Sequence, residues 1–87
     1  MKSRLKITNS GDRAMLVFTE MEAQDYWLLP GESVEVRAEV ESSDEVFELE
    51  VNPDGVTVFP SVGMGYISTW SEGRLLECGH QRPSGWT

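Results

Sequence analysis

The only cysteine and the only histidine of this 87-residue sequence stand two positions apart, as Cys78-Gly79-His80. Thiolate and imidazole both bind metals, and in an extended chain side chains at this spacing point to the same side. A zinc site needs two more nitrogen or sulfur ligands, and a blue-copper site needs a second histidine. We therefore predict no metal and no cofactor. A minor metal or redox site at Cys78 and His80 is the alternative to a plain turn that ends the last strand.

Nucleophilic catalysis by the same pair would need the imidazole within hydrogen-bonding distance of the thiol and a third group that orients it. Neither a glycine-rich oxyanion loop nor a Gly-x-Ser-x-Gly elbow accompanies the pair. Carboxylates are abundant, but an acid–base pair needs an enclosed cleft that separates two pKa values, and 87 residues leave little room for one. We expect no catalytic residues and a protein that is not an enzyme.

Fifteen acidic residues against seven basic ones give the chain a formal net charge of −8. This charge repels nucleic-acid phosphates and anionic membranes, so neither is expected as a partner. Acidic residues crowd the stretch from Glu39 to Glu50, whereas Lys2, Arg4 and Lys6 crowd the first strand. Because opposite charges on neighbouring strands attract, we predict that the first strand lies near the acidic hairpin in the same sheet. A solvated acidic face without a partner is the alternative.

Three tryptophans are many for so short a chain, and an exposed aromatic patch would mark a protein or carbohydrate surface. The alternative is that the tryptophans fill the core of a small β domain. The residues expected at a partner surface are Glu39, Glu41, Glu48, Glu50, Trp27 and Trp70.

Apolar and polar residues alternate with a period of two, which indicates strands that place one face on a core. The longest alternation covers residues 34–41, and the pattern returns over 4–8 and 47–51. Residues 15–18 and 26–29 are apolar throughout, which predicts inner strands, or strands whose outer face is covered by a loop or another chain. Residues 56–59, 66–70 and 74–77 complete a count of about eight strands. Between them, residues 20–26 favour one helical turn or a wide loop.

Glycine and proline separate these strands at short intervals. Leu29-Pro30-Gly31-Glu32 predicts a type II turn, and Asp54-Gly55 predicts a hairpin. Short strands with frequent turns indicate an all-β fold, a small antiparallel β-sandwich of Greek-key type, with a small barrel as the alternative. We expect a single β domain over residues 1–79 and an irregular tail over 80–87, anchored by Trp86 if it is ordered.

Three strings of the sequence carry a resemblance, namely residues 26–36, residues 55–59 and Cys-Gly-His-Gln-Arg-Pro at 78–83. With them the chain resembles short uncharacterised bacterial all-β proteins of the actinomycete type that end in CGHQRP. The Leu-Pro-Gly-Glu-Ser-Val turn is also similar to one in cupredoxin-like Greek-key sandwiches. The first resemblance implies no activity. The second implies a sandwich without copper ligands, because no second histidine is present and no methionine follows Cys78.

These observations favour a non-catalytic protein-binding or self-associating β-sandwich module. A protein partner or a homo-oligomer is expected. An inhibitor or immunity-type protein, which would mask a basic enzyme with its acidic surface, is the alternative. A lone cysteine fits a reducing compartment, and no apolar segment follows the basic N-terminal residues, so we expect a cytoplasmic protein.

Overall fold

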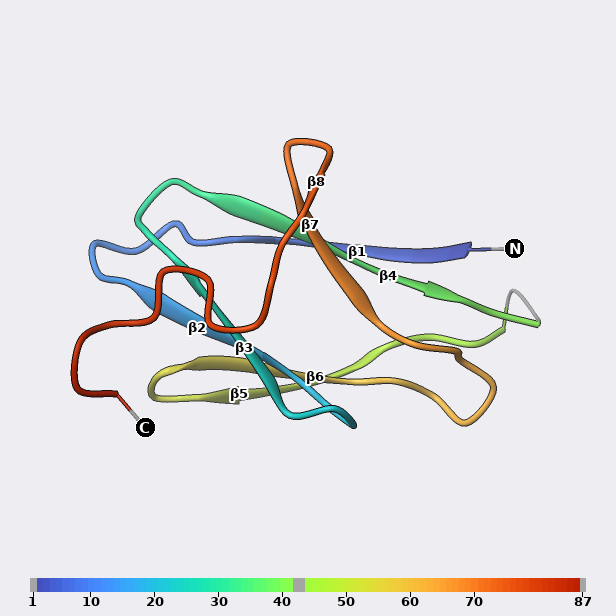
Figure 1. Cartoon of the computed structure of the whole chain (residues 1–87). Helices are drawn as coiled ribbons and strands as arrows, with labels where there is room; N and C mark the ends of the chain where they lie inside the picture. The colour runs from blue at the N-terminus through green and yellow to red at the C-terminus, as the bar shows by residue number, and fades with distance from the viewer. Residues whose placement is uncertain (1, 42–43, 87) are drawn as a thin grey trace.

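The computed structural model describes residues 2–41 and 44–86, and it is an all-β sandwich of two four-stranded sheets (Figure 1). The strands are β1 (Lys2–Thr8), β2 (Met15–Thr19), β3 (Gln24–Leu28), β4 (Ser33–Glu39), β5 (Glu48–Asn52), β6 (Gly55–Phe59), β7 (Ser68–Ser71) and β8 (Arg74–Leu75). The predicted fold class and the count of about eight strands are confirmed. Met1 and Thr87, the ends of the predicted domain and tail, lie outside the described residues.

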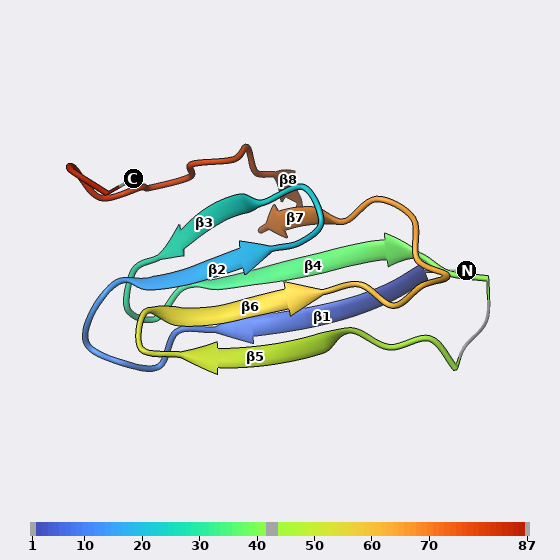
Figure 2. The same ribbon diagram turned by 90° about the horizontal axis from the view of Figure 1, so that it is seen from below.

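Sheet A has the strand order β1-β4-β7-β8, and sheet B has the order β3-β2-β6-β5. Neighbouring strands are antiparallel except β2 and β6, which run parallel. Each sheet therefore has two edge strands. Figure 2 shows β1 and β5 together on one side of the sandwich, with β3, β8 and the C-terminal tail on the opposite side.

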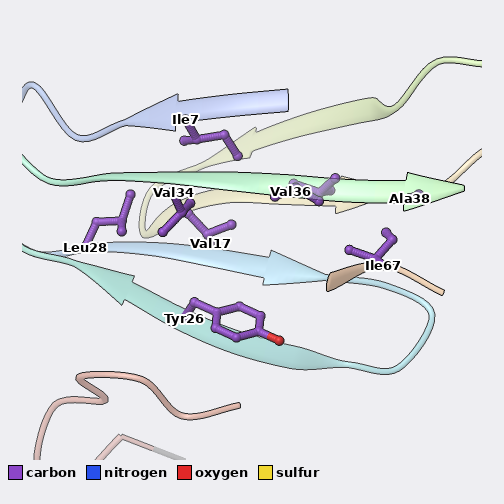
Figure 3. Close-up of a cluster of buried hydrophobic side chains, with 9 residues drawn as sticks. Ile7, Val17, Tyr26, Leu28, Val34, Val36, Ala38 and Ile67 are labelled. Atoms are coloured by element: carbon purple, nitrogen blue, oxygen red, sulfur yellow. The ribbon is translucent and has the colours of Figure 1, made fainter. Parts of the chain in front are cut away.

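The core between the sheets follows from the alternation that is clearest in β4. Val34, Val36 and Ala38 are at most 2% exposed and point inward, whereas the residues between them face outward. Side chains from both sheets meet in one apolar cluster (Figure 3). Its buried members are Ile7, Val17, Tyr26, Leu28, Val34, Val36, Ala38, Val58 and Ile67.

Two turns have the geometry that their residues favour. The predicted type II turn is confirmed, since Glu32 donates its backbone N–H to the Leu29 carbonyl and Gly31 has φ of 86°. The β7–β8 hairpin has a two-residue turn in which Glu72 and Gly73 have φ of 50° and 78°. Positive φ at both positions is typical of a type I′ turn, whose twist matches that of the flanking strands.

Asn9 joins the β1–β2 turn to the β3–β4 turn and is only 3% exposed. Its side-chain amide donates to the carbonyls of Leu28 and Arg13 at 2.9 and 2.8 Å, and its Oδ1 accepts from the Gly11 N–H at 3.0 Å. Its own backbone N–H donates to the Glu32 carbonyl. A single buried side chain thus satisfies polar groups from both turns, which holds one end of the sandwich together.

The two segments that are apolar on both faces, residues 15–18 and 26–29, occupy different positions in sheet B. β2 lies between β3 and β6 inside sheet B, as predicted for an inner strand. β3 is an edge strand, and its outer face is covered by the C-terminal tail, which corresponds to the predicted covering loop. Residues 20–23 form a turn without a helix, and β3 begins at Gln24.

Two sequence-based predictions about β1 and β5 are wrong in part. Leu49 and Val51 were expected on the core, and their register beside Val58 and Val56 does place them on the inward face. They are nevertheless 47% and 79% exposed, because β5 is the last strand of sheet B and the opposite sheet does not cover it. The first strand pairs with β4, which sets Lys2 opposite Glu39, but β5 with its glutamates belongs to the other sheet.

Candidate functional site

A groove with a volume of about 1050 Å³ lies on the outer face of sheet A. Its floor is formed by the outward side chains of β4, and one wall is the β7–β8 hairpin, which stands out beyond the sheet in Figure 1. The segment 76–81 completes the rim. Pockets of about 300–1000 Å³ are typical of ligand sites, so this groove is large enough for a segment of another chain.

The floor of the groove holds a stacked pair, Arg37 of β4 and Trp70 of β7. The guanidinium carbon of Arg37 lies 4.5 Å from the centroid of the Trp70 ring, a cation–π contact. Arg37 also donates to the Glu35 carboxylate, and this hydrogen bond lowers the pKa of Glu35. Trp70 donates its indole N–H to Ser68 Oγ at 2.8 Å. Arg37 and Trp70 are therefore both held in place by contacts within the protein.

Asp25 of β3 fastens the tail that forms the rim, and this carboxylate is only 3% exposed. Arg82 donates to its two oxygens at 2.8 and 2.6 Å, and Trp27 Nε1 donates at 3.0 Å. The thiol of Cys78 donates from 3.4 Å. These hydrogen bonds, with that from Arg82 first, outweigh the effect of burial and lower the pKa of Asp25 to about 2.

The tail also adds main-chain hydrogen bonds along the edge of β3. Gly79 donates its N–H to the Asp25 carbonyl at 2.7 Å, and Trp27 donates its N–H to the His80 carbonyl at 2.9 Å. The side-chain amide of Gln81 donates to the Trp27 carbonyl at 2.8 Å. The edge of β3 is therefore paired by a short parallel bridge between Tyr26 and His80 instead of being open to solvent.

Trp86 packs over the outer face of β3. Its ring meets that of Trp27 edge to face, with centroids 5.2 Å apart and an interplanar angle of 76°. Gln81 donates to Glu32 Oε1 at 2.8 Å, and this hydrogen bond, followed by one from the Leu29 N–H, lowers the pKa of Glu32. The tail is thus irregular in backbone and attached by several side chains from Cys78 to Trp86.

Cys78 and His80 lie in this attachment, but not in the extended geometry that a shared metal would use. The chain turns between them, because His80 donates its N–H to the Glu77 carbonyl and Gly79 has φ of 87°. The thiol points to Asp25. Within residues 2–41 and 44–86, no group of three or more histidine, cysteine, aspartate or glutamate side chains is arranged to hold a metal ion.

The residues predicted for a partner surface lie in several places. Trp70 is half-buried in the groove, whereas Trp27 is 6% exposed beneath the tail. Glu39 is an outward residue of β4 in sheet A, and Glu41 follows that strand in an exposed position. Glu48 and Glu50 alternate with the inward residues of β5 and so face outward from sheet B. Because the two outer faces point in opposite directions, the predicted acidic surface is divided between them.

Sequence reasoning missed Asp25, Arg82 and Arg37. Asp25 is the only charged residue within an otherwise apolar or amide-bearing strand, QDYWL, which was a usable sign of a buried and paired carboxylate. Arg82 could have been proposed as its partner only by knowing where the tail lies. Arg37 looked like an ordinary outward residue of an alternating strand, and its contact with Trp70 depends on the pairing of β4 with β7.

No family model matches the chain, and neither a curated protein nor a solved structure matches it. In the part of the chain that the structure describes, no helix has the length and apolar character that a membrane crossing needs.

Proposed function

We propose that this protein is a non-catalytic protein-binding module that holds a polar segment of a partner protein in the groove on sheet A. The observation that supports the proposal is the stacked Arg37–Trp70 pair in the floor of a groove of about 1050 Å³. Tryptophan and arginine are the residue types that most often dominate the free energy of protein association.

The walls of the groove are held in place by contacts within the protein. The hairpin wall is closed by its two-residue turn, and the rim at 76–81 is held by the contacts of Asp25 with Arg82 and Cys78. A site that is ordered before binding loses less conformational entropy when a partner arrives. This rigidity supports a binding role for the groove.

The charges in the groove indicate the chemistry of the partner. Basic and acidic side chains both line it in nearly equal numbers, so neither sign dominates. The charged residues at the groove are Lys6, Glu32, Glu35, Arg37, Glu72, Arg74 and Glu77. Such a lining suits a peptide segment with side chains of both signs better than a polyanion, which would meet four carboxylates.

A library of displayed random peptides tests the proposal, because it offers the groove many segments of different charge and shape at once. We expect the protein to enrich a family of sequences whose affinity falls by about tenfold or more in Trp70→Ala, as for an interface hot spot. Tyr66→Ser is the matched control, because Tyr66 is 87% exposed and lies outside the groove. Circular dichroism would verify that both variants fold. Failure to enrich any sequence, or equal binding by the Trp70 variant, would contradict the proposal.

A further inference from the structure

On the side of the sandwich opposite the tail lie two edge strands, β1 of sheet A and β5 of sheet B (Figure 2), and no segment within residues 2–41 and 44–86 pairs with their outer edges. Both run in the same direction, as the arrows in Figure 2 show. An edge strand has main-chain N–H and C=O groups available to pair with another strand. This side of the molecule therefore offers two such edges, one in each layer.

Apolar side chains lie between these two edges without a cover. Leu49 and Val51 share the inward face of β5 with the core but are 47% and 79% exposed. Leu5 of β1, which points inward from the other sheet, is only partly buried against the core. An apolar seam of this kind is a place where burial by another molecule would release water from hydrocarbon surface.

The outward side chains of the two edges have opposite charges. Lys2, Arg4 and Lys6 are exposed on β1, and Arg4 also lies 4.0 Å from Glu35 of its own sheet. Glu48 and Glu50 are exposed on β5, where their neighbours in β6 are Phe59 and Thr57. One edge is thus basic and the other acidic, at the same spacing of two residues.

We propose that two copies of this chain associate through this side, with β1 of each copy pairing in parallel with β5 of the other. A two-fold axis parallel to the strands places sheet A of one copy beside sheet B of the other. Each basic β1 edge then meets an acidic β5 edge, and the apolar seams of the two copies face each other. A two-fold axis perpendicular to the layers would instead pair β1 with β1 and β5 with β5, which places like charges opposite each other. Charge complementarity therefore selects a second copy in the first arrangement. The groove on sheet A shares only Lys6 with the β1 edge, so the inference does not rest on the proposed function.

Sedimentation velocity from low micromolar to near-millimolar concentration, with the full chain, is the first test. We expect a reversible dimer that weakens with added salt. The paired variant Glu48→Lys/Glu50→Lys makes both edges basic and should raise the dissociation constant by about tenfold or more. Lys2→Glu/Arg4→Glu gives β1 acidic side chains like those of β5, so that both edges repel, and should do the same. Combining all four substitutions exchanges the charges of the edges and should restore the dimer.

Glu72→Lys/Glu77→Lys is the matched control, because it changes the net charge equally on the side of β8 and should leave the dimer intact. Hydrogen exchange is the second measurement. Raising the protein concentration should slow exchange at the amides of β1 and β5 only. A wild-type chain that stays monomeric throughout would overturn the proposal. So would a dimer that Glu48→Lys/Glu50→Lys does not weaken, or one that protects other strands.

Discussion

The two edge strands of sheet B, β3 and β5, differ in whether another segment covers them. At β3, the tail supplies main-chain hydrogen bonds, an ion pair between Arg82 and the buried Asp25, and an aromatic cover. At β5, all side chains except that of Asn52 are exposed, including Leu49 and Val51. Edge strands promote association unless they are covered or charged, and this protein covers one edge and charges the other.

The contrast between β3 and β5 shows where the tail acts. The same segment that closes the β3 edge also forms the rim of the groove on sheet A. Its attachment to β3 therefore both covers the edge and shapes the groove. The β5 edge has no comparable segment within residues 2–41 and 44–86, and its exposed glutamates would favour a basic strand as its partner. Substitutions and acid should therefore affect the two edges differently, and the largest effect is expected at β3.

Asp25→Ala should release the tail from β3, so that the β3 edge becomes open like the β5 edge. It leaves Arg82 and the Trp27 indole N–H without their acceptor, and a broken ion pair of this kind, with Arg82 partly exposed, costs about 2–3 kcal/mol of unfolding free energy. Urea denaturation measures the loss, and faster hydrogen exchange at Trp27 and Gly79 would show that the edge has opened. Asp12→Ala, in the exposed β1–β2 turn, is the control. Unchanged exchange at both amides would contradict the assignment of the tail as an edge cover.

Asn9→Ala should destabilise the protein without opening either edge. It removes the donor to the buried Leu28 carbonyl and the acceptor of the Gly11 N–H, at a cost of about 2 kcal/mol. Urea denaturation should therefore show a lower midpoint with an unchanged slope. The amide of Gly79 should keep its native hydrogen-exchange protection under conditions where the variant remains folded. A selective loss of protection there would mean that the tail depends on the turns and not on Asp25.

Acid should weaken the β3 edge through the Asp25 carboxyl. Its pKa is about 2 in the folded protein against an ordinary value of 3.8, so the charged form is stabilised by folding. That stabilisation is fully present above pH 3.8 and is lost as the pH falls towards 2, by about 1–2 kcal/mol after allowance for solvent screening. Thermal unfolding of the wild type and of Asp25→Asn over this range measures it. A wild type and a variant with parallel pH profiles would refute the role of Asp25.

Val51→Thr should have the smallest effect. Because Val51 is 79% exposed in the monomer, the change should alter the unfolding free energy by less than about 0.5 kcal/mol at low protein concentration. Chemical denaturation at low micromolar concentration measures this, with Val58→Thr in the buried core of β6 as a contrast. A large loss at Val51 would mean that the β5 edge is covered in solution even in the dilute protein.

Alternation and turn chemistry determined much of the fold. The period-two pattern of residues 34–41 predicted the strand that the structure gives as β4, Ser33–Glu39, and Pro30-Gly31 predicted the turn that is observed. Both signals are local, because alternation and turn residues act within a few positions of the chain. The sequence also lacks the second histidine or cysteine that a zinc or blue-copper site within one chain would need.

The tertiary structure alone decided which edges are covered. Alternation shows that Leu49 and Val51 share a face, but it cannot show that the opposite sheet ends before reaching them. Likewise, Asp25 and Arg82 are separated by 57 positions, and nothing in their spacing brings them together. Periodicity reports the direction of a side chain relative to its own strand, whereas burial depends on what lies across from it, and that is set by the order of strands and the path of the tail.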